Sequence, residues 1–410
     1  MARVILIIAF LSCFSTLTSQ ELDGGNGHAI ILDSKGDVYT IGRNTYGQLG
    51  DSSFQSSSTP IKVIKIPKIK SISRGYNHSI AIDSAGNLWT WGRNNYGQLG
   101  TSLPDDYNFP QMLRNHSNFA TAEGGHWHTV ALKLDGSVWV WGHNFYGELG
   151  NGTREHSNIP TQVVDSNGNP LTNISQISSV GYHTLAVDSN GHVFSWGGND
   201  FLQLGYTQPA IQPFAKKIKN LKRISQVATG WHHSIALDSN GNIYAWGSIP
   251  SKMKEGKITS HRQIDVITGL PKIKKIACGS WHSLAIDSAG NLWTWGRNDY
   301  GMLGDGSNAN SDEPIKIKGV TDVISIGAGC FQSLASDSKG NIWTFGDNFD
   351  GQQGQGNNER LLIPKRLSLI QLPEKNKYSI FKKSSNLLFL ILGISLLLNG
   401  FLLFKLKNRG

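Results

Sequence analysis

Histidines at a regular spacing are the first residues of this 410-residue chain that could act as acid–base groups or metal ligands. A turn of small residues ends in His at six places, and Gln takes the seventh: His28, His78, His128, His183, His233, His282 and Gln332. Successive positions lie 50, 50, 55, 50, 49 and 50 residues apart, so one structural unit is copied seven times. An active site needs one constellation rather than seven. We therefore interpret the repeated His as a packing residue.

The third copy holds further histidines that could ligate a metal ion. His126, His143 and His156 accompany the repeat residue His128, and His126 and His128 fall on one face of a predicted strand. No Cys or carboxylate joins them at the spacing of a known zinc ligand set. We predict no metal site and no cofactor.

An Asp-Ser-x-Gly sequence after the repeat His could be mistaken for part of a calcium loop. The loop of an EF-hand needs its Gly at the sixth position and a Glu at its end, whereas here the Gly is fourth. A tight turn explains the pattern better, because the Asp carboxylate can accept backbone N–H bonds while the Gly adopts unusual dihedrals. The turn recurs at Asp33, Asp83, Asp188, Asp238, Asp287 and Asp337.

The residues on both sides of this turn alternate as β-strands do. In the second copy, Ile80 and Ile82 alternate with small residues before the turn, and Leu88 and Thr90 follow it with the same period. A glycine-punctuated loop and a further extended segment complete the copy. About four short strands in about 50 residues is the size of one propeller blade. We predict an all-β, seven-bladed β-propeller.

We place the propeller at residues 21–371 and expect its two ends to share one blade. The chain opens inside a unit, at the His28 hairpin. Pro364 to Ile370 is the kind of segment that precedes such a hairpin in every other copy. Pairing the two parts would leave no open sheet edge.

The net charge of +9 does not indicate nucleic-acid binding once its distribution is considered. From Lys365 onward there are nine basic residues against Glu374 alone, and the repeats are close to neutral. Duplex DNA binding therefore lacks an electrostatic basis in the repeats. We predict no nucleic-acid partner.

The start of the chain has the pattern of an export signal. Arg3, the apolar run Val4 to Leu11 and a polar stretch follow the order of a secretory signal peptide, which we place at residues 1–20. A lipoprotein signal, in which Cys13 would carry the lipid, is the alternative.

The end of the chain has the pattern of a membrane anchor. Leu387 to Phe404 contains no charge and would form about 27 Å of helix, which just spans a bilayer. We predict a transmembrane helix at residues 387–404, a tether at 372–386 and a basic tail at 405–410. Basic residues on both sides leave the orientation open. We expect a single-pass protein exported through its N-terminal signal or, alternatively, a tail-anchored protein with its propeller in the cytosol.

No group of residues indicates covalent catalysis. Cys278 and Cys330 occupy unlike positions of neighbouring repeats, which predicts two free buried thiols. We find no nucleophile elbow, phosphate-binding loop or paired metal motif. We expect no catalytic residues, and we do not expect an enzyme.

The repeat resembles that of a known family. Gly75 to Gly100 and Gly279 to Gly304 carry almost complete the phrase Gly-x-x-His-Ser-x-Ala-x-Asp-Ser-x-Gly-Asn-x-Trp-x-Trp-Gly-x-Asn-x-Tyr-Gly-Gln-Leu-Gly. This phrase is similar to the repeat of the regulator of chromosome condensation family, and the likeness covers Gly25 to about Ile370. The resemblance implies a seven-bladed propeller. The founding member is an exchange factor for the small GTPase Ran, whereas other relatives are photoreceptors, enzyme inhibitors, ubiquitin-ligase modules or effectors of intracellular bacteria, so the fold is better defined than the function.

Positions at which one copy departs from the others are the candidates for function. The fifth copy replaces the Asn-x-Tyr-Gly-Gln-Leu-Gly phrase by Ser248 to His261. In the founding exchange factor a wedge that acts on the GTPase replaces the same loop, although its residues are not closely similar. An ordinary solvated basic loop is the alternative. We predict a partner contact through Pro250, Lys252, Lys254, Glu255, Lys257 and His261.

A second departure is the segment Asp165 to Pro170, which accounts for the 55-residue spacing. We interpret it as an extended hairpin tip or a partner contact, and we add Asn167 and Asn169 to the predicted contact residues.

Two functions fit these observations. The first is a membrane-anchored, monomeric propeller that binds a protein partner, in particular a Ran-like small GTPase, as an exchange factor or regulator; it would include a host-directed bacterial effector. Exchange needs no acid, base or nucleophile, because a loop that binds the empty GTPase better shifts the population. The second is an exported cell-surface receptor or adhesion module with no GTPase partner, which the signal-like start favours.

Overall fold

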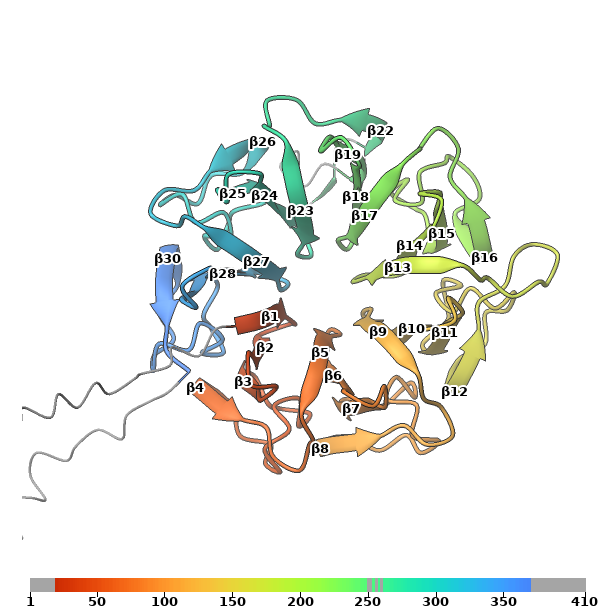
Figure 1. The fold of residues 1–410 in the computed structure, drawn as a ribbon, viewed down its shortest axis with the longest axis horizontal. Helices are drawn as coiled ribbons and strands as arrows, with labels where there is room; N and C mark the ends of the chain where they lie inside the picture. Colours follow the sequence, from red (N-terminus) through yellow and green to blue (C-terminus); the bar gives the residue numbers. More distant parts are fainter. Residues whose placement is uncertain (1–18, 249–252, 255–256, 259–260, 370–410) are drawn as a thin grey trace, which may run out of the picture. The chain divides into compact units, whose positions relative to one another are not determined.

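The computed structural model describes residues 19–248, 253–254, 257–258 and 261–369. Within these residues the chain forms seven four-stranded antiparallel sheets arranged around an axis as the blades of a propeller (Figure 1). The prediction of an all-β, seven-bladed propeller is confirmed. No helix among the described residues has the length and apolarity of a membrane span. The predicted tether, transmembrane helix and basic tail lie outside the described residues, as does the predicted signal peptide up to residue 18.

Each blade is built in chain order from the axis outward. The inner strands are β1 (Ser19–Gly24), β5 (Ile69–Arg74), β9 (Phe119–Gly124), β13 (Ile174–Ser179), β17 (Ile224–Thr229), β23 (Ile273–Cys278) and β27 (Val323–Ala328). The second strands are β2 (His28–Asp33), β6 (His78–Asp83), β10 (His128–Lys133), β14 (His183–Asp188), β18 (His233–Asp238), β24 (His282–Asp287) and β28 (Gln332–Asp337).

The two remaining strands of each blade lie toward the rim. The third strands are β3 (Val38–Gly42), β7 (Leu88–Gly92), β11 (Val138–Gly142), β15 (Val193–Gly198), β19 (Ile243–Ser248), β25 (Leu292–Gly296) and β29 (Ile342–Gly346). The outer strands are β4 (Ser57–Lys62), β8 (Tyr107–Met112), β12 (Ser157–Gln162), β16 (Ile211–Lys217), β22 (His261–Val266), β26 (Ser311–Lys316) and β30 (Leu361–Leu367). In the fifth blade, β20 (Met253–Lys254) pairs with β21 (Lys257–Ile258) as a separate two-stranded sheet.

The Asp-Ser-x-Gly turn joins the second and third strands as predicted. In the second blade, Asp83 Oδ1 accepts hydrogen bonds from the backbone N–H groups of Ala85 and Asn87, each at 2.9 Å. Gly86 adopts a φ of +82°, which a residue with a Cβ rarely does. The Asp therefore acts as a turn residue.

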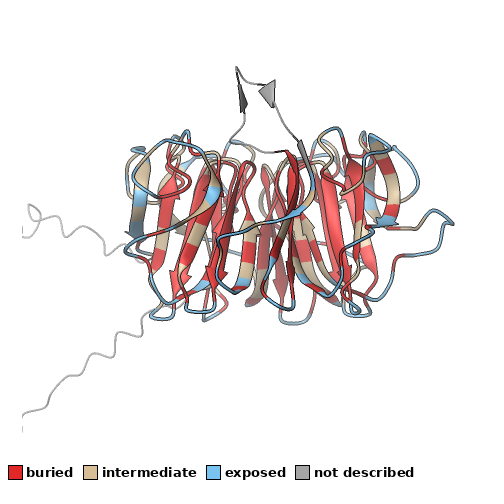
Figure 2. Ribbon diagram, turned by 90° about the horizontal axis from the view of Figure 1, so that it is seen from above, coloured by how far each residue is buried: buried red, intermediate tan, exposed pale blue. Residues whose placement is uncertain are grey.

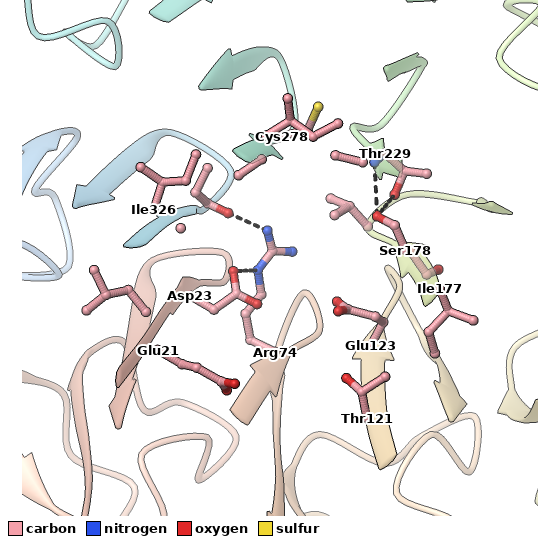
Figure 3. Close-up of a pocket in the computed structure, with 18 of the residues that line it drawn as sticks. Glu21, Asp23, Arg74, Thr121, Glu123, Ile177, Ser178, Thr229, Cys278 and Ile326 are labelled. Atoms are coloured by element: carbon pink, nitrogen blue, oxygen red, sulfur yellow. Dashed lines mark hydrogen bonds and ion pairs between the residues drawn. The ribbon is translucent and has the colours of Figure 1, made fainter. Parts of the chain in front are cut away.

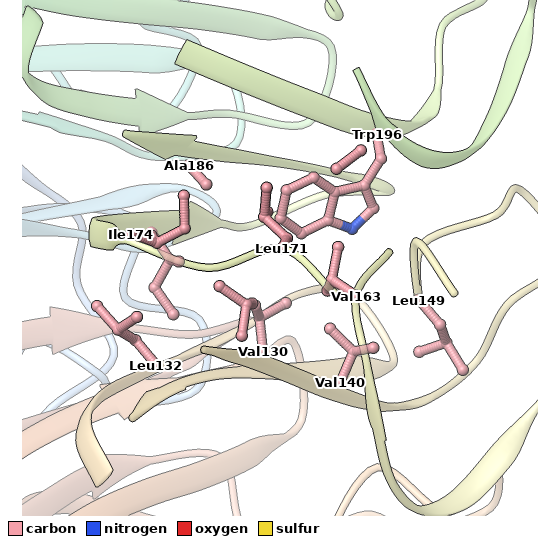
Figure 4. Close-up of a cluster of buried hydrophobic side chains, with 12 residues drawn as sticks. Val130, Leu132, Val140, Leu149, Val163, Leu171, Ile174, Ala186 and Trp196 are labelled. Carbon is pink, nitrogen blue, oxygen red and sulfur yellow. The ribbon is translucent and has the colours of Figure 1, made fainter. Parts of the chain in front are cut away.

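Hydrophobic side chains are buried between neighbouring blades. One cluster joins Val130 and Val140 of the third blade to Ile174 and Trp196 of the fourth (Figure 4). The buried residues run along the strands, whereas the exposed ones lie mainly in the loops and at the rim (Figure 2). Because every sheet buries both faces against a neighbour, no blade has a complete core of its own.

The repeated Trp and Gln residues connect each blade to the next. The Trp91 indole donates to the carbonyl of Gln48 in the preceding blade at 2.9 Å, and the Ser79 hydroxyl donates to the same oxygen at 2.8 Å. Three further junctions have the same indole-to-carbonyl bond: Trp141 to Gln98, Trp196 to Glu148 and Trp246 to Gln203.

The repeated His residues also bridge blades, which supports their interpretation as packing residues. His78 Nε2 lies 3.1 Å from Thr129 Oγ1, and His282 Nε2 lies 2.8 Å from Ser333 Oγ. The other four repeat histidines make the same kind of contact with a hydroxyl of the next blade. Gln332, at the seventh position, donates instead to the carbonyl of His28 at 2.7 Å.

The expectation that the chain ends share a blade is wrong. Leu361–Leu367 is the outer strand of the seventh blade, and Ser19–Gly24 supplies the inner strand of the first. Closure instead uses contacts between complete blades: Arg43 pairs with Asp350 at 2.8 Å, and a cluster that includes Leu22 packs apolar residues of both blades together. The first blade needs no strand from the C-terminus because β1 already occupies that place.

Acidification is expected to destabilise the fold through the buried histidines. Burial lowers the pKa of His28, His78 and His282 to about 3 and that of His128 to about 4. An unfolded His has a pKa of about 6.5, so between about pH 6.5 and the folded value the unfolded chain binds more protons. The contribution of these histidines to the unfolding free energy is therefore fully present above about pH 6.5. It falls as the pH decreases, by about 1.4 kcal/mol per pH unit for each His.

His78→Gln, which copies the residue at the seventh position, removes one of the side chains that take up a proton on unfolding. We expect the slope of the unfolding free energy against pH to decrease by about 1.4 kcal/mol per unit between about pH 4 and pH 6. Urea denaturation at several pH values measures this slope. An unchanged slope would show that His78 is protonated in the folded state.

Candidate partner-binding face

One face of the propeller collects the connections that differ most between blades. Because strands alternate in direction, the turn between the first and second strands and the loop between the third and outer strands lie at the same end of each blade. We call this end the loop face. The β19–β22 connection belongs to it, and Ser248 pairs with His261 on either side of the insertion. The fifth-copy insertion therefore starts and ends on the loop face.

Aromatic rings meet at the axis on the loop face. The ring centroids of Tyr76 and His126 are 4.1 Å apart, and those of Tyr76 and Trp231 are 5.7 Å apart. His126 and Trp231 are separated by 5.3 Å. These residues come from the second, third and fifth blades, so they converge only because the ring closes. We define the axial aromatic cluster as Tyr76, His126, Trp127, Tyr182, Trp231, His232 and Trp281, which are joined by ring contacts.

Several polar atoms of the cluster have no internal partner. Trp127 Nε1, Trp231 Nε1 and His126 Nδ1 are buried without a hydrogen bond in the part of the chain that the structure describes. Burial lowers the pKa of His126 to about 3 and raises that of Tyr76 to about 12, so both rings are neutral at pH 7. Uncharged aromatic rings with a polar handle are the residues that protein interfaces favour.

Arginine residues also lie in the connections of the loop face. The guanidinium of Arg93 lies 4.6 Å from the ring centroid of Tyr46, and that of Arg360 lies 4.7 Å from the ring centroid of Tyr300. At the junction of the seventh and first blades, a cavity of about 330 Å³ is lined in part by Arg43. An apolar centre with a charged rim is the general anatomy of a protein-binding surface.

A polar cavity of about 240 Å³ lies along the axis between the inner strands (Figure 3). Arg74 spans it: Nε pairs with Asp23 at 3.3 Å, and Nη2 donates to the carbonyl of Ala328 at 2.5 Å. Glu21 accepts a hydrogen bond from the backbone N–H of Ile72 at 2.7 Å. These contacts join the first, second and seventh blades, so they serve the closure of the ring.

Glu123 is one of three carboxyl groups in the cavity whose pKa is raised by burial, together with Glu21 and Asp23. Burial, and then the charge of Asp23, raise the pKa of Glu123 to about 8. Its carboxyl accepts a hydrogen bond from the Ser73 hydroxyl at 3.1 Å. The residues that line the cavity supply no nucleophile with an adjacent base, so a perturbed pKa alone does not define an active site here.

The histidines of the third copy have separate partners. His143 Nδ1 lies 2.7 Å from Glu148 Oε1, and the His156 ring stacks on His143 at 4.7 Å. His128 Nε2 contacts Ser179 Oγ at 3.0 Å, whereas His126 stacks on Trp127. Among the described residues, no three His, Cys, Asp or Glu side chains converge as metal ligands. Cys278 and Cys330 are free and buried, as predicted.

The predicted contact residues do not form one patch. Asn167 and Asn169 lie in an exposed turn whose backbone N–H groups donate to Asp165 Oδ1 at 2.8 and 2.9 Å. This turn belongs to the β12–β13 connection, at the opposite end of the blade from the loop face. Of the fifth-copy residues, Lys254, Lys257 and His261 belong to β20, β21 and β22, and Pro250, Lys252 and Glu255 lie outside the described residues.

Sequence reasoning missed the axial aromatic cluster. Its members occupy the two positions before each repeat His, and these positions vary from copy to copy. A signal was present, because Tyr76, His126, Trp127 and Trp231 are aromatic rings at positions that turn geometry does not require. The pattern could have been found by comparing those two positions between copies instead of searching for the largest departure.

The fold and the loop face define a seven-bladed propeller with the anatomy of a protein-binding module. A family model described as an RCC1-like domain matches residues 104–388, and the chain belongs to this family. Models of the regulator of chromosome condensation (RCC1) repeat match residues 35–82 and, separately, residues 21–48 and 69–98.

Individual relatives match at modest identity. The regulator of chromosome condensation of Xenopus laevis is 36% identical over 62 residues, which span 15% of this chain and 15% of that protein. Prp20p from Saccharomyces cerevisiae, a protein that binds Gsp1p and histones, has a structure with a TM-score of 0.71 at 24% identity, covering 81% of this chain and 86% of its own. Human WBSCR16 has a TM-score of 0.71 at 21% identity, with 78% and 87% covered. The two structures share the fold.

Removing the Arg74 guanidinium from the axial cavity should weaken the closed ring. Arg74→Met leaves Asp23 without its cation and the Ala328 carbonyl without its donor, so we expect a loss of about 3–5 kcal/mol in unfolding free energy. Adding Asp23→Asn should recover part of this loss, because the unpaired charge is then removed. Urea denaturation measures both values. A loss of less than about 1 kcal/mol for the single variant would contradict the role of Arg74 in closure.

Proposed function

We propose that this protein is a protein-binding propeller that regulates a Ran-like small GTPase as a guanine-nucleotide exchange factor. The partner docks on the loop face. One observation carries this proposal: the axial aromatic cluster and the fifth-copy insertion share one face of the propeller, and neither is required by the repeat. Membership of the RCC1-like domain family supports the fold on which such a surface is built.

The choice of a GTPase rests on the relatives. The Xenopus regulator of chromosome condensation shares one segment with this chain, and Prp20p, which shares its fold, binds Gsp1p. Exchange requires no acid, base or nucleophile, only a surface that binds the nucleotide-free GTPase more tightly than the loaded one. Neutral rings with unpaired N–H groups offer such a surface, and the insertion that starts and ends on the same face carries several lysines in its sequence.

The central aromatic ring offers the sharpest test. We expect the full-length chain to accelerate release of a fluorescent guanine nucleotide from Ran, and Trp231→Ala to reduce this acceleration by about thirtyfold, because a buried interface Trp often contributes about 2 kcal/mol or more. Trp139→Ala is the matched control, since Trp139 is also half-buried but lies on β11 beside Lys133. Stopped-flow fluorescence measures the rates.

The insertion is tested separately with charge reversal. Lys254→Glu combined with Lys257→Glu should lower the release rate, whereas Lys272→Glu combined with Lys318→Glu, two exposed lysines at the opposite end of the blades, should not. If the unmodified chain gives no acceleration of nucleotide release, the exchange function is rejected.

We further propose that residues 387–404 anchor the protein in a membrane. A GTPase partner then requires a cytosolic propeller, through a tail anchor or through delivery into a host cell. The apolar run of residues 4–11 favours the second candidate, an exported receptor or adhesion module. Protease added to intact cells separates the two: degradation of the propeller together with no effect on nucleotide release supports the receptor, whereas protection supports the cytosolic regulator.

A further inference from the structure

The loop of one blade usually protects the outer strand of the next. At four junctions a backbone N–H in the loop donates to a carbonyl of the following outer strand: Ser52 to Asn108, Gly152 to Pro213, Gly306 to Leu362 and Gly356 to Ser58, at 2.7 to 2.9 Å. At the junction of the second and third blades, Asn158 Nδ2 donates to the carbonyl of Ser102 at 2.8 Å. These bonds cover sheet edges that could otherwise pair with another chain.

The loop of the fourth blade does not protect the outer strand of the fifth blade in this way, for a reason visible in its sequence. The four N–H donors all have a φ between +70° and +90°. Thr207 stands at the corresponding position of the fourth blade, and a β-branched residue is strongly disfavoured at positive φ. Leu202 stands where the loop of the first blade has Gly47, and it adopts a φ of +61°. Among the described residues, no backbone bond reaches β22 from the fourth blade.

A groove lies where this bond is missing. Its volume is about 590 Å³, and it runs between β16 of the fourth blade and β22 of the fifth. Three exposed lysines line it, and Lys216 Nζ lies 4.2 Å from the ring centroid of Tyr206. Asp265, which also lines the groove, accepts a hydrogen bond from the backbone N–H of Val266 at 2.8 Å. The lining residues used below are Leu202, Tyr206, Lys216, Lys217, Lys219 and Ile264.

We propose that this rim groove binds an acidic, extended segment of a partner protein, which adds a strand to the outer edge of β22. An uncovered strand edge is a template for strand addition, in which main-chain bonds supply affinity and alternate side chains supply specificity. The apolar side chains of the segment would lie against Leu202, Tyr206 and Ile264, and its carboxylates would face the lysines. Six residues of β22 accommodate a strand of about 20 Å.

Charge selects the occupant. The groove presents three lysines against Asp265, so it favours an acidic ligand. The chain's own C-terminal segment does not fit, because it carries nine basic residues from Lys365 onward and Glu374 as its one acid. This site lies at the rim, away from the axial aromatic cluster, and it does not depend on a GTPase partner.

The test uses the full-length chain and the fluorescein-labelled peptide Val-Glu-Val-Glu-Val-Glu, with Val-Lys-Val-Lys-Val-Lys as the opposite-charge control. Fluorescence anisotropy should show saturable binding of the acidic peptide alone. Lys217→Glu combined with Lys219→Glu should weaken binding by about tenfold or more, because attraction becomes repulsion. Lys316→Glu combined with Lys318→Glu, at the same positions in the sixth blade, should leave binding unchanged.

Two results would overturn the proposal. The first is a failure of the groove to bind selectively. This would be seen either as no binding of the acidic peptide or as an equal loss of affinity in both lysine-pair variants, and the equal loss would mean that general charge attraction holds the peptide. The second concerns the backbone of β22. If a strand is added there, saturating peptide slows amide hydrogen exchange in β22. Lysine-dependent binding that leaves exchange in β22 unchanged would exclude strand addition.

Discussion

The ring depends on a backbone carbonyl that one blade presents and the next blade satisfies. The carbonyl of Gln48 accepts bonds from Trp91 and Ser79 of the following blade, and without them it would be buried and unpaired. The loop that presents it passes so close that a Cβ on Gly50 would lie 2.6 Å from Trp91 Nε1. Gly, Gln, Trp and Ser are therefore repeated because together they make one junction, whose indole-to-carbonyl bond is present at four places among the described residues.

This constraint decides where the chain can vary. The side chains at the two positions before each repeat His take no part in this carbonyl junction, although the backbone N–H of Tyr76 bonds the carbonyl of Gly125 in the next blade. At these positions Tyr76, His126 and Trp231 gather at the axis. The insertion of the fifth blade is different, because it replaces the loop that would present the carbonyl to the sixth blade. A cavity of about 30 Å³ lined by Trp246 and Trp295 lies at that junction.

The sequence was sufficient for the repeat number, the blade and its turn, because each depends on residues copied at a fixed spacing. It was insufficient for closure. Ser19–Gly24 forms a full inner strand. The repeated turn and His come only after this segment, so nothing in its own residues distinguished it from the end of a signal peptide. The axial aromatic cluster was missed for another reason: Tyr76 and Trp231 are far apart in the sequence and meet only across the ring. The rim groove depends on the backbone conformation near Thr207, which periodicity does not describe.

Hydrogen exchange of the full-length chain, with and without nucleotide-free Ran, tests most directly whether the turns that carry the axial aromatic cluster form the binding surface. We expect slower exchange at the turns that carry Tyr76, His126 and Trp231, and no change at the Asp-Ser-x-Gly turns on the opposite end of the blades. Protection confined to those Asp turns, or no protection anywhere, would contradict the assignment of the loop face as the site of partner binding.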